Sequence, residues 1–177
     1  EKKVKIIELY KNSVRLRDIN LNVSVGNVVW NQCKDILTND KTKTLLIYSS
    51  DIKNNKLCIQ TYSNNSKKNY INKKGLKEPI LLLNRGYGTG EYKFEYCLIH
   101  GNKEYLVENH IICIKSKVKK DNKLMIKLYN KIINSFNNSK TKEFIKLYFG
   151  NNAINTTELC EILPIYGFNS KQTIKKK

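Results

Sequence analysis

Trp30, Asn31 and Gln32 place the only tryptophan of the chain beside two side-chain amides. An amide donates and accepts at the same time, so Asn and Gln can pair with both polar atoms that adenine presents in the major groove of DNA. A lone tryptophan is more often a core residue, and Asn31 and Gln32 would then be ordinary loop residues. The sequence thus offers a base-reading group here, with a purely structural interpretation beside it.

A glycine-rich segment follows an apolar run and reads Asn84-Arg85-Gly86-Tyr87-Gly88-Thr89-Gly90. A phosphate-binding P-loop would end in Gly-Lys-Ser or Gly-Lys-Thr and lead into a helix, whereas the residues that follow here alternate like a strand. We expect a glycine-rich hairpin with Arg85 and Tyr87 at its tip. It is either a plain turn or a loop that contacts DNA bases through Asn84, Arg85 and Tyr87.

Lysine dominates the charge of the chain. There are 33 Lys and Arg against 15 Asp and Glu, a formal net charge of +18 on 177 residues. A field of that sign concentrates phosphate-bearing partners, and nucleic acid is the first candidate. In the polar loop 63–75, we expect Lys67, Lys68, Lys73 and Lys74 to contact phosphates. Alternatively, A/T-rich codons raise the lysine content without a functional cause, since Asn and Ile are also abundant and arginine is scarce.

Catalytic and metal-binding patterns are weak. His100 and His110 have no Cys or carboxylate at metal-ligand spacing, so no metal is expected. Asp40 with Asp51-Ile52-Lys53 loosely resembles the acidic pair and lysine of metal-dependent nucleases, a pattern that arises easily by chance in a lysine-rich chain. The sequence contains no nucleophile elbow and no dinucleotide fingerprint. We therefore expect a binding protein.

The five cysteines are odd in number, scattered, and never in C-x-x-C spacing. They predict reduced thiols and an intracellular protein. No apolar run approaches the roughly 18 residues of a membrane span, so no membrane partner is expected.

Short β-type runs separated by polar clusters predict a strand-rich lobe over residues 1–117. The expected strands are 4–9, 24–30, 44–48, 57–62, 79–83, 92–99 and 105–114. Apolar residues then recur at steps of three and four, which predicts a helical lobe with a basic tail over residues 118–177. Expected helix caps are Asp121, Asn138 or Ser139, and Asn155. The fold class is thus α+β: a mixed or antiparallel sheet region followed by a small carboxy-terminal helical bundle, together forming one domain.

The order of several segments resembles the target recognition domain of TaqI-like N6-adenine DNA methyltransferases. These segments are VGNVVWNQCK (25–34), LIYSSDI (46–52), NRGYG (84–88), YLVENHI (105–111), TEL (157–159) and LPIY (163–166). The family's catalytic Asn-Pro-Pro-Tyr/Phe motif and its S-adenosylmethionine loop do not occur here, so no catalytic residue and no cofactor is assigned to this chain. The resemblance implies a module that reads double-stranded DNA, with S-adenosylmethionine held by a catalytic domain or subunit elsewhere.

Two other functions remain open. The same kind of domain could serve as the specificity subunit of a multisubunit restriction-modification system. An RNA-binding protein is the alternative from another class, because a charge of +18 suits RNA equally well.

Overall fold

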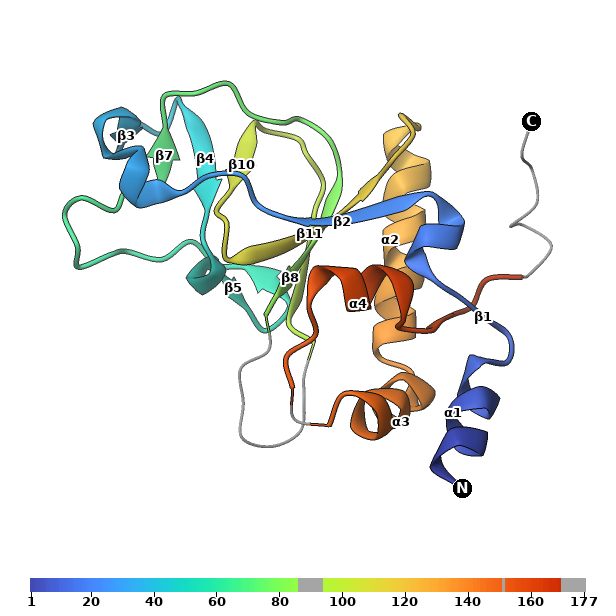
Figure 1. Cartoon of the computed structure of the whole chain (residues 1–177). Coiled ribbons are helices and arrows are strands. Elements are labelled where there is room, and N and C mark those ends of the chain that lie inside the picture. Colours follow the sequence, from blue (N-terminus) through green and yellow to red (C-terminus); the bar gives the residue numbers. More distant parts are fainter. Residues whose placement is uncertain (86–93, 151, 170–177) are drawn as a thin grey trace.

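The computed structural model describes residues 1–85, 94–150 and 152–169, which form an α+β fold of two four-stranded sheets, two two-stranded pairs and a set of helices. Figure 1 shows the helices on one side of the central sheet and the second sheet on its other side. The expected fold class is therefore confirmed. In the described part of the chain, no helix is long and apolar enough to cross a membrane.

The central sheet has the strand order β2-β11-β8-β9, and every pair in it is antiparallel. Its strands are β2 (Leu21–Val25), β8 (Ile80–Asn84), β9 (Tyr96–Ile99) and β11 (Ile111–Ser116). The middle strands β8 and β11 are nearly continuous apolar runs because both of their faces are covered. Leu81 and Ile112 pack toward the helices, while Leu82 and Cys113 pack toward the second sheet.

The second sheet has the order β10-β4-β7-β3, with one parallel pair, β10 with β4. Its strands are short: β3 (Leu37–Thr38), β4 (Thr44–Ile47), β7 (Tyr70–Ile71) and β10 (Tyr105–Val107). Ile47 and Tyr105 face the central sheet. Leu46 and Ile71 face the opposite way, into a small hydrophobic cluster that we call the third core, after the cluster against the helices and the cluster between the two sheets. This third core holds the Trp30 turn against the sheet.

The carboxy-terminal helices begin at the residues that the sequence predicts. Asp121 accepts a hydrogen bond from Leu124 N at the start of α2 (Asn122–Phe136), and Asn138 caps α3 (Ser139–Tyr148). Asn155 and Glu158 form a capping box at α4 (Thr156–Glu161). Such caps satisfy backbone N–H groups that have no partner within the helix, which fixes where each helix starts.

One predicted strand is wrong. Residues 4–9 lie in the helix α1 (Lys2–Tyr10), which contacts α3. Its β-branched residues suggested a strand, but the side chains that pack on the core are Ile6, Leu9 and Tyr10. These positions follow the i, i+3, i+4 spacing of one helix face.

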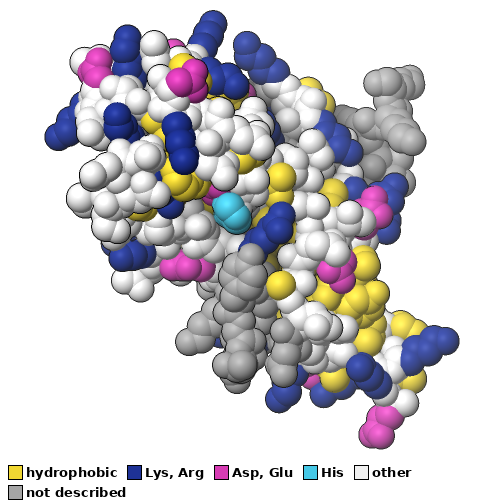
Figure 2. All heavy atoms as spheres, turned by 60° about the vertical axis from the view of Figure 1, so that its left-hand side comes forward, with side chains coloured by type: hydrophobic (Ala, Val, Ile, Leu, Met, Phe, Trp, Pro, Cys, Tyr) yellow, Lys and Arg dark blue, Asp and Glu magenta, His cyan; other side chains and the backbone are white. Residues whose placement is uncertain are grey.

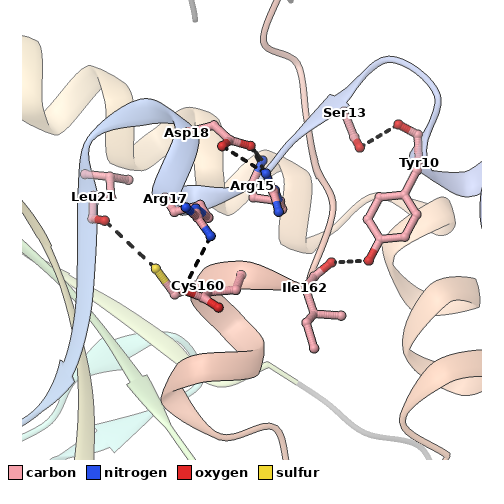
Figure 3. Close-up of polar contacts among 9 residues, drawn as sticks. Tyr10, Ser13, Arg15, Arg17, Asp18, Leu21, Cys160 and Ile162 are labelled. Carbon is pink, nitrogen blue, oxygen red and sulfur yellow. Dashed lines mark hydrogen bonds and ion pairs between the residues drawn. The ribbon is translucent and has the colours of Figure 1, made fainter.

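The first twenty residues pack with the helices rather than with the second sheet (Figure 3). Strand β1 (Ser13–Val14) pairs with β12 (Ile165–Tyr166), and the Tyr10 hydroxyl donates to the Ile162 carbonyl oxygen. Arg17 forms an ion pair of 3.6 Å with Glu161 on α4. The amino-terminal segment is thus fastened to the helical side by contacts remote in sequence.

Several other predicted strands differ in extent. The run 105–114 forms two strands, β10 and β11, because the Glu108 carboxylate accepts a hydrogen bond from the His110 backbone N–H and makes a turn between them. Strand β2 ends at Val25, well before Trp30. Of the predicted run 57–62, only Leu57 lies in a strand, β6 (Lys56–Leu57), which pairs with β5 (Ile52–Lys53). The first residues predicted for the strand 92–99 lie outside the described residues.

Candidate nucleic-acid interface

The Trp30–Gln32 segment forms one turn of 3-10 helix, two residues after the buried Val28. The Trp30 ring is half-buried against the third core, while Asn31 and Gln32 are exposed. The structural interpretation of Trp30 is therefore supported, while the base-reading role of the two amides stays a prediction. The tryptophan anchors the turn, and the two amides are free to reach a ligand.

Three aromatic rings surround the ammonium group of Lys67. Lys67 Nζ lies 4.4 Å from the ring centres of Tyr48 and Tyr62 and 5.7 Å from that of Trp30. Ammonium groups are attracted to aromatic faces at such distances. Lys67 therefore fastens the loop 58–69 to the Trp30 turn. Lys68 takes part through its backbone, because its carbonyl oxygen accepts a 2.7 Å hydrogen bond from the Tyr48 hydroxyl.

A buried carboxylate supports this aromatic group. Asp51 is 0 % exposed and accepts hydrogen bonds from Tyr48 N (2.9 Å), Gln60 N (2.8 Å) and the Tyr62 hydroxyl (2.8 Å). Burial, with the Asp51 charge nearby, raises the pKa of both Tyr48 and Tyr62, so both phenols stay protonated and act as donors. Asp51 is thus occupied in holding the loop, which contradicts the nuclease pattern considered for it.

Asn84 and Arg85 lie at the end of β8, and their surroundings differ. Asn84 is half-buried, and its Nδ2 donates to the Ser49 carbonyl oxygen and to Glu95 Oε2, both at 3.1 Å. Its Oδ1 is buried and has no hydrogen-bond partner among the described residues. Arg85 is exposed and able to reach a ligand. Tyr87 lies outside the described residues.

The turn Ser49–Asp51 joins these two groups of predicted site residues. Ser49 accepts from Asn84 on one side, and the Ser50 hydroxyl lies 3.0 Å from the Tyr62 hydroxyl on the other. The fold thus connects residues more than fifty positions apart in the sequence. We call this group the recognition face. Its members are Trp30, Asn31, Gln32, Tyr62, Lys67, Asn84 and Arg85.

Lys73 and Lys74 line a separate groove of about 850 Å³ beside β4 and β7. Four lysines that sequence reasoning did not single out share its walls: Lys41, Lys43, Lys77 and Lys103. Within the described ranges, none of these six lysines lies in an ion pair. Figure 2, which turns the second sheet toward the viewer, shows basic side chains outnumbering acidic ones on this side. We call this feature the lysine groove.

The sequence carries only a weak signal for the four additional lysines. Lys41 and Lys43 precede β4, while Lys103 precedes β10. The pairing of β4 with β10 and with β7 brings these segments to the same place. Strand pairing between distant segments cannot be read from local spacing, so this cluster is visible only in the structure.

Metal ligands and reactive thiols are not gathered anywhere in the described residues. No group of three or more His, Cys, Asp or Glu side chains there could hold a metal ion. The cysteines are free, and burial raises the pKa of Cys97 to about 11 and that of Cys113 to about 12. Thiols with such values remain protonated and unreactive near neutral pH.

Comparison of the sequence with protein-family models and with curated proteins finds no match. The function must therefore be argued from the two surfaces themselves. Ammonium groups in a groove can contact phosphates regardless of base sequence, whereas exposed amides and a guanidinium can read base edges. The chain carries both kinds of group on separate surfaces.

Proposed function

We propose that this chain is a sequence-specific recognition domain for double-stranded DNA, belonging to an N6-adenine DNA methyltransferase of the restriction-modification type. The observation that supports this best is the Trp30 turn, in which Asn31 and Gln32 are exposed while the half-buried Trp30 packs on the third core. Reading a base edge requires a side chain held in a fixed register, and the third core provides that support.

The remaining recognition residues fit the same role. Arg85 is exposed at the end of β8, and arginine is the residue that most often pairs with guanine in the major groove. The net charge of +18 supplies attraction to phosphates that does not depend on sequence. The sequence resemblance to TaqI-like target recognition domains adds the expected partner, a catalytic domain or subunit that carries S-adenosylmethionine. That partner would extract the recognised adenine from the helix and methylate it.

Competition binding tests the choice of nucleic acid. A fluorescein-labelled 20-base-pair DNA duplex is bound to the chain and displaced by unlabelled duplex or by an RNA hairpin of the same stem length. The proposal predicts that DNA duplex displaces the probe at the lower concentration. A clear preference for the RNA hairpin would refute it and support an RNA-binding protein.

A further inference from the structure

The lysine groove is lined by apolar side chains as well as by lysines. Leu45, Ile59 and Tyr70 lie among its lining residues, and the Ile59 side chain is 44 % exposed. Tyr70 and Leu45 are paired residues on β7 and β4, so their side chains lie on the same face of the sheet. An aromatic ring and an exposed aliphatic side chain thus lie among the lysines that line the groove.

The segment that carries Lys73, Lys74 and Lys77 is held firmly. Leu76 and Tyr105 exchange backbone hydrogen bonds of 2.8 and 3.0 Å, and the Thr44 hydroxyl donates to the Lys73 carbonyl oxygen at 2.6 Å. A side chain at Gly75 would place its Cβ 2.5 Å from Thr44 Cγ2, so glycine permits this close approach. These contacts fix the backbone from which three of the six lysines project.

Glu104 is the one carboxylate that lines the lysine groove within the described residues. Its Oε2 accepts from Gly75 N at 3.1 Å and lies 3.3 Å from the Thr44 hydroxyl. Glu104 thus holds the turn in place and leaves the six ammonium groups unpaired. Unpaired lysines that surround a groove attract a chain of phosphates.

The apolar lining residues favour single-stranded over double-stranded nucleic acid. A duplex hides its base faces by stacking and offers a groove mainly phosphates and base edges. A single strand exposes its base faces, which stack on aromatic side chains while the backbone follows basic residues. From this combination we infer that the lysine groove binds a single-stranded stretch of nucleic acid, with one base stacked on Tyr70 and phosphates on the surrounding lysines.

This inference goes beyond duplex recognition and does not depend on it, because it uses neither Asn31 nor Arg85. A second hollow of about 690 Å³ shares Leu45, Asn102, Lys103 and Glu104 with the groove. Its lining includes Lys56, Leu57 and Tyr96, so the same mixture of basic and apolar groups continues toward β9.

Fluorescence anisotropy with 5′-labelled dT12, which forms no secondary structure, tests the inference. Two variants address the groove: Lys73→Gln with Lys74→Gln, and Tyr70→Leu. The matched control is Lys123→Gln with Lys127→Gln, which removes two exposed charges from α2. Thermal unfolding shows that each variant is folded before binding is compared.

The groove variants should each weaken dT12 binding by about tenfold, and the control by less than about twofold. The lysine variant should also lower the salt slope by about 1.4, since each phosphate contact of a single strand contributes about 0.7. Labelled U12 in place of dT12 tells whether the strand is DNA or RNA. Tighter binding of either one than of a 12-base-pair duplex supports the inference.

Three results would overturn it. The first is an equal loss in the groove and control lysine variants, which would reduce the effect to net charge. The second is unchanged dT12 binding in Tyr70→Leu, which would show that the groove binds chains of phosphates without stacking a base. Inorganic polyphosphate would then bind as tightly as dT12. The third is tighter binding of the 12-base-pair duplex than of dT12 and U12, with the duplex affinity lowered by the groove variants. Duplex binding that is lost only on changing Asn31 and Gln32 bears on the recognition face and leaves the groove unaffected.

Discussion

Lys67 Nζ lies 4.4 Å from the centre of the Tyr48 ring, and this contact links the loop 58–69 to the core. The sequence predicts a polar basic loop, 63–75, in which Lys67 contacts phosphates. In the structure the Lys67 ammonium group lies beside three aromatic rings. The rigidity of the recognition face depends on this arrangement, because Trp30 is one of those rings.

Replacing Lys67 with alanine should lower the free energy of unfolding by about 1 kcal/mol, the scale of a partly exposed cation–π contact. Lys68→Ala is the matched control, since Lys68 contributes to the cluster through its backbone carbonyl only. Urea unfolding followed by Trp30 fluorescence gives both values. Equal losses in the two variants would show that the ring contact contributes nothing.

Asp51→Asn should destabilise the chain by about 2 kcal/mol. The buried carboxylate accepts hydrogen bonds from two backbone N–H groups and the Tyr62 hydroxyl, and an amide places an NH₂ group where one of these donors points. Asp40→Asn serves as the control because Asp40 is exposed and bonded within its own turn, to Thr42. Chemical unfolding compares the two, and a greater loss at Asp40 would contradict the role given to Asp51.

Incubation of the chain with plasmid DNA and magnesium should leave the plasmid supercoiled. The reason is that Asp51 is buried and fully engaged in hydrogen bonds, so it has no oxygen to offer a metal ion at the surface. Agarose electrophoresis gives the answer. Magnesium-dependent nicking that disappears in Asp51→Ala, with the variant still folded, would restore the nuclease interpretation.

Arg85→Ala should relax the preference for one base by about 1 to 3 kcal/mol if the guanidinium reads guanine. Affinities for a set of duplexes that differ at single positions measure this. Lys34→Ala is the comparison, since Lys34 is exposed beside the Trp30 turn: it should weaken all duplexes alike, because a phosphate contact carries no sequence information. A uniform loss in Arg85→Ala would reassign Arg85 to phosphate binding.

Thiol reactivity should follow burial. At pH 8 the exposed Cys58 should react first with a thiol reagent, since Cys97 and Cys113, with pKa values raised to about 11 and 12, remain protonated. Mass spectrometry after timed labelling identifies each site, and labelling in denaturant gives the reference rates. Equal rates for all cysteines in the native protein would contradict the burial of β9 and β11.

Local signals predicted the parts of the fold that local chemistry determines. Asp121, Asn138 and Asn155 cap helices because each cap is an interaction within a few residues. Helix α1 was missed because Val4, Ile6 and Ile7 suggest a strand until the contact with α3 is known. Asn31 and Gln32 were proposed from residue type, and their base-reading role stays a prediction. The six-lysine groove depends on strands that pair across the chain, so local spacing does not reveal it.

The salt dependence of duplex binding should be steep. Each phosphate contact lowers log Kobs by about 0.9 for each unit of log salt concentration, so several lysine contacts give a slope of several units. Anisotropy titrations measure this slope between about 50 and 200 mM salt, a range that includes the physiological concentration. A flat response would mean that the lysines do not contact phosphates.

Selection from a random duplex library tests the central claim most directly. The chain is incubated with the library, bound duplexes are recovered and sequenced over several rounds, and Asn31→Ala with Gln32→Ala is carried in parallel. The account predicts one enriched motif containing adenine, bound about 10³-fold more tightly than scrambled duplex, and loss of that motif in the variant. Recovery of no motif, or of the same motif with the variant, would contradict it.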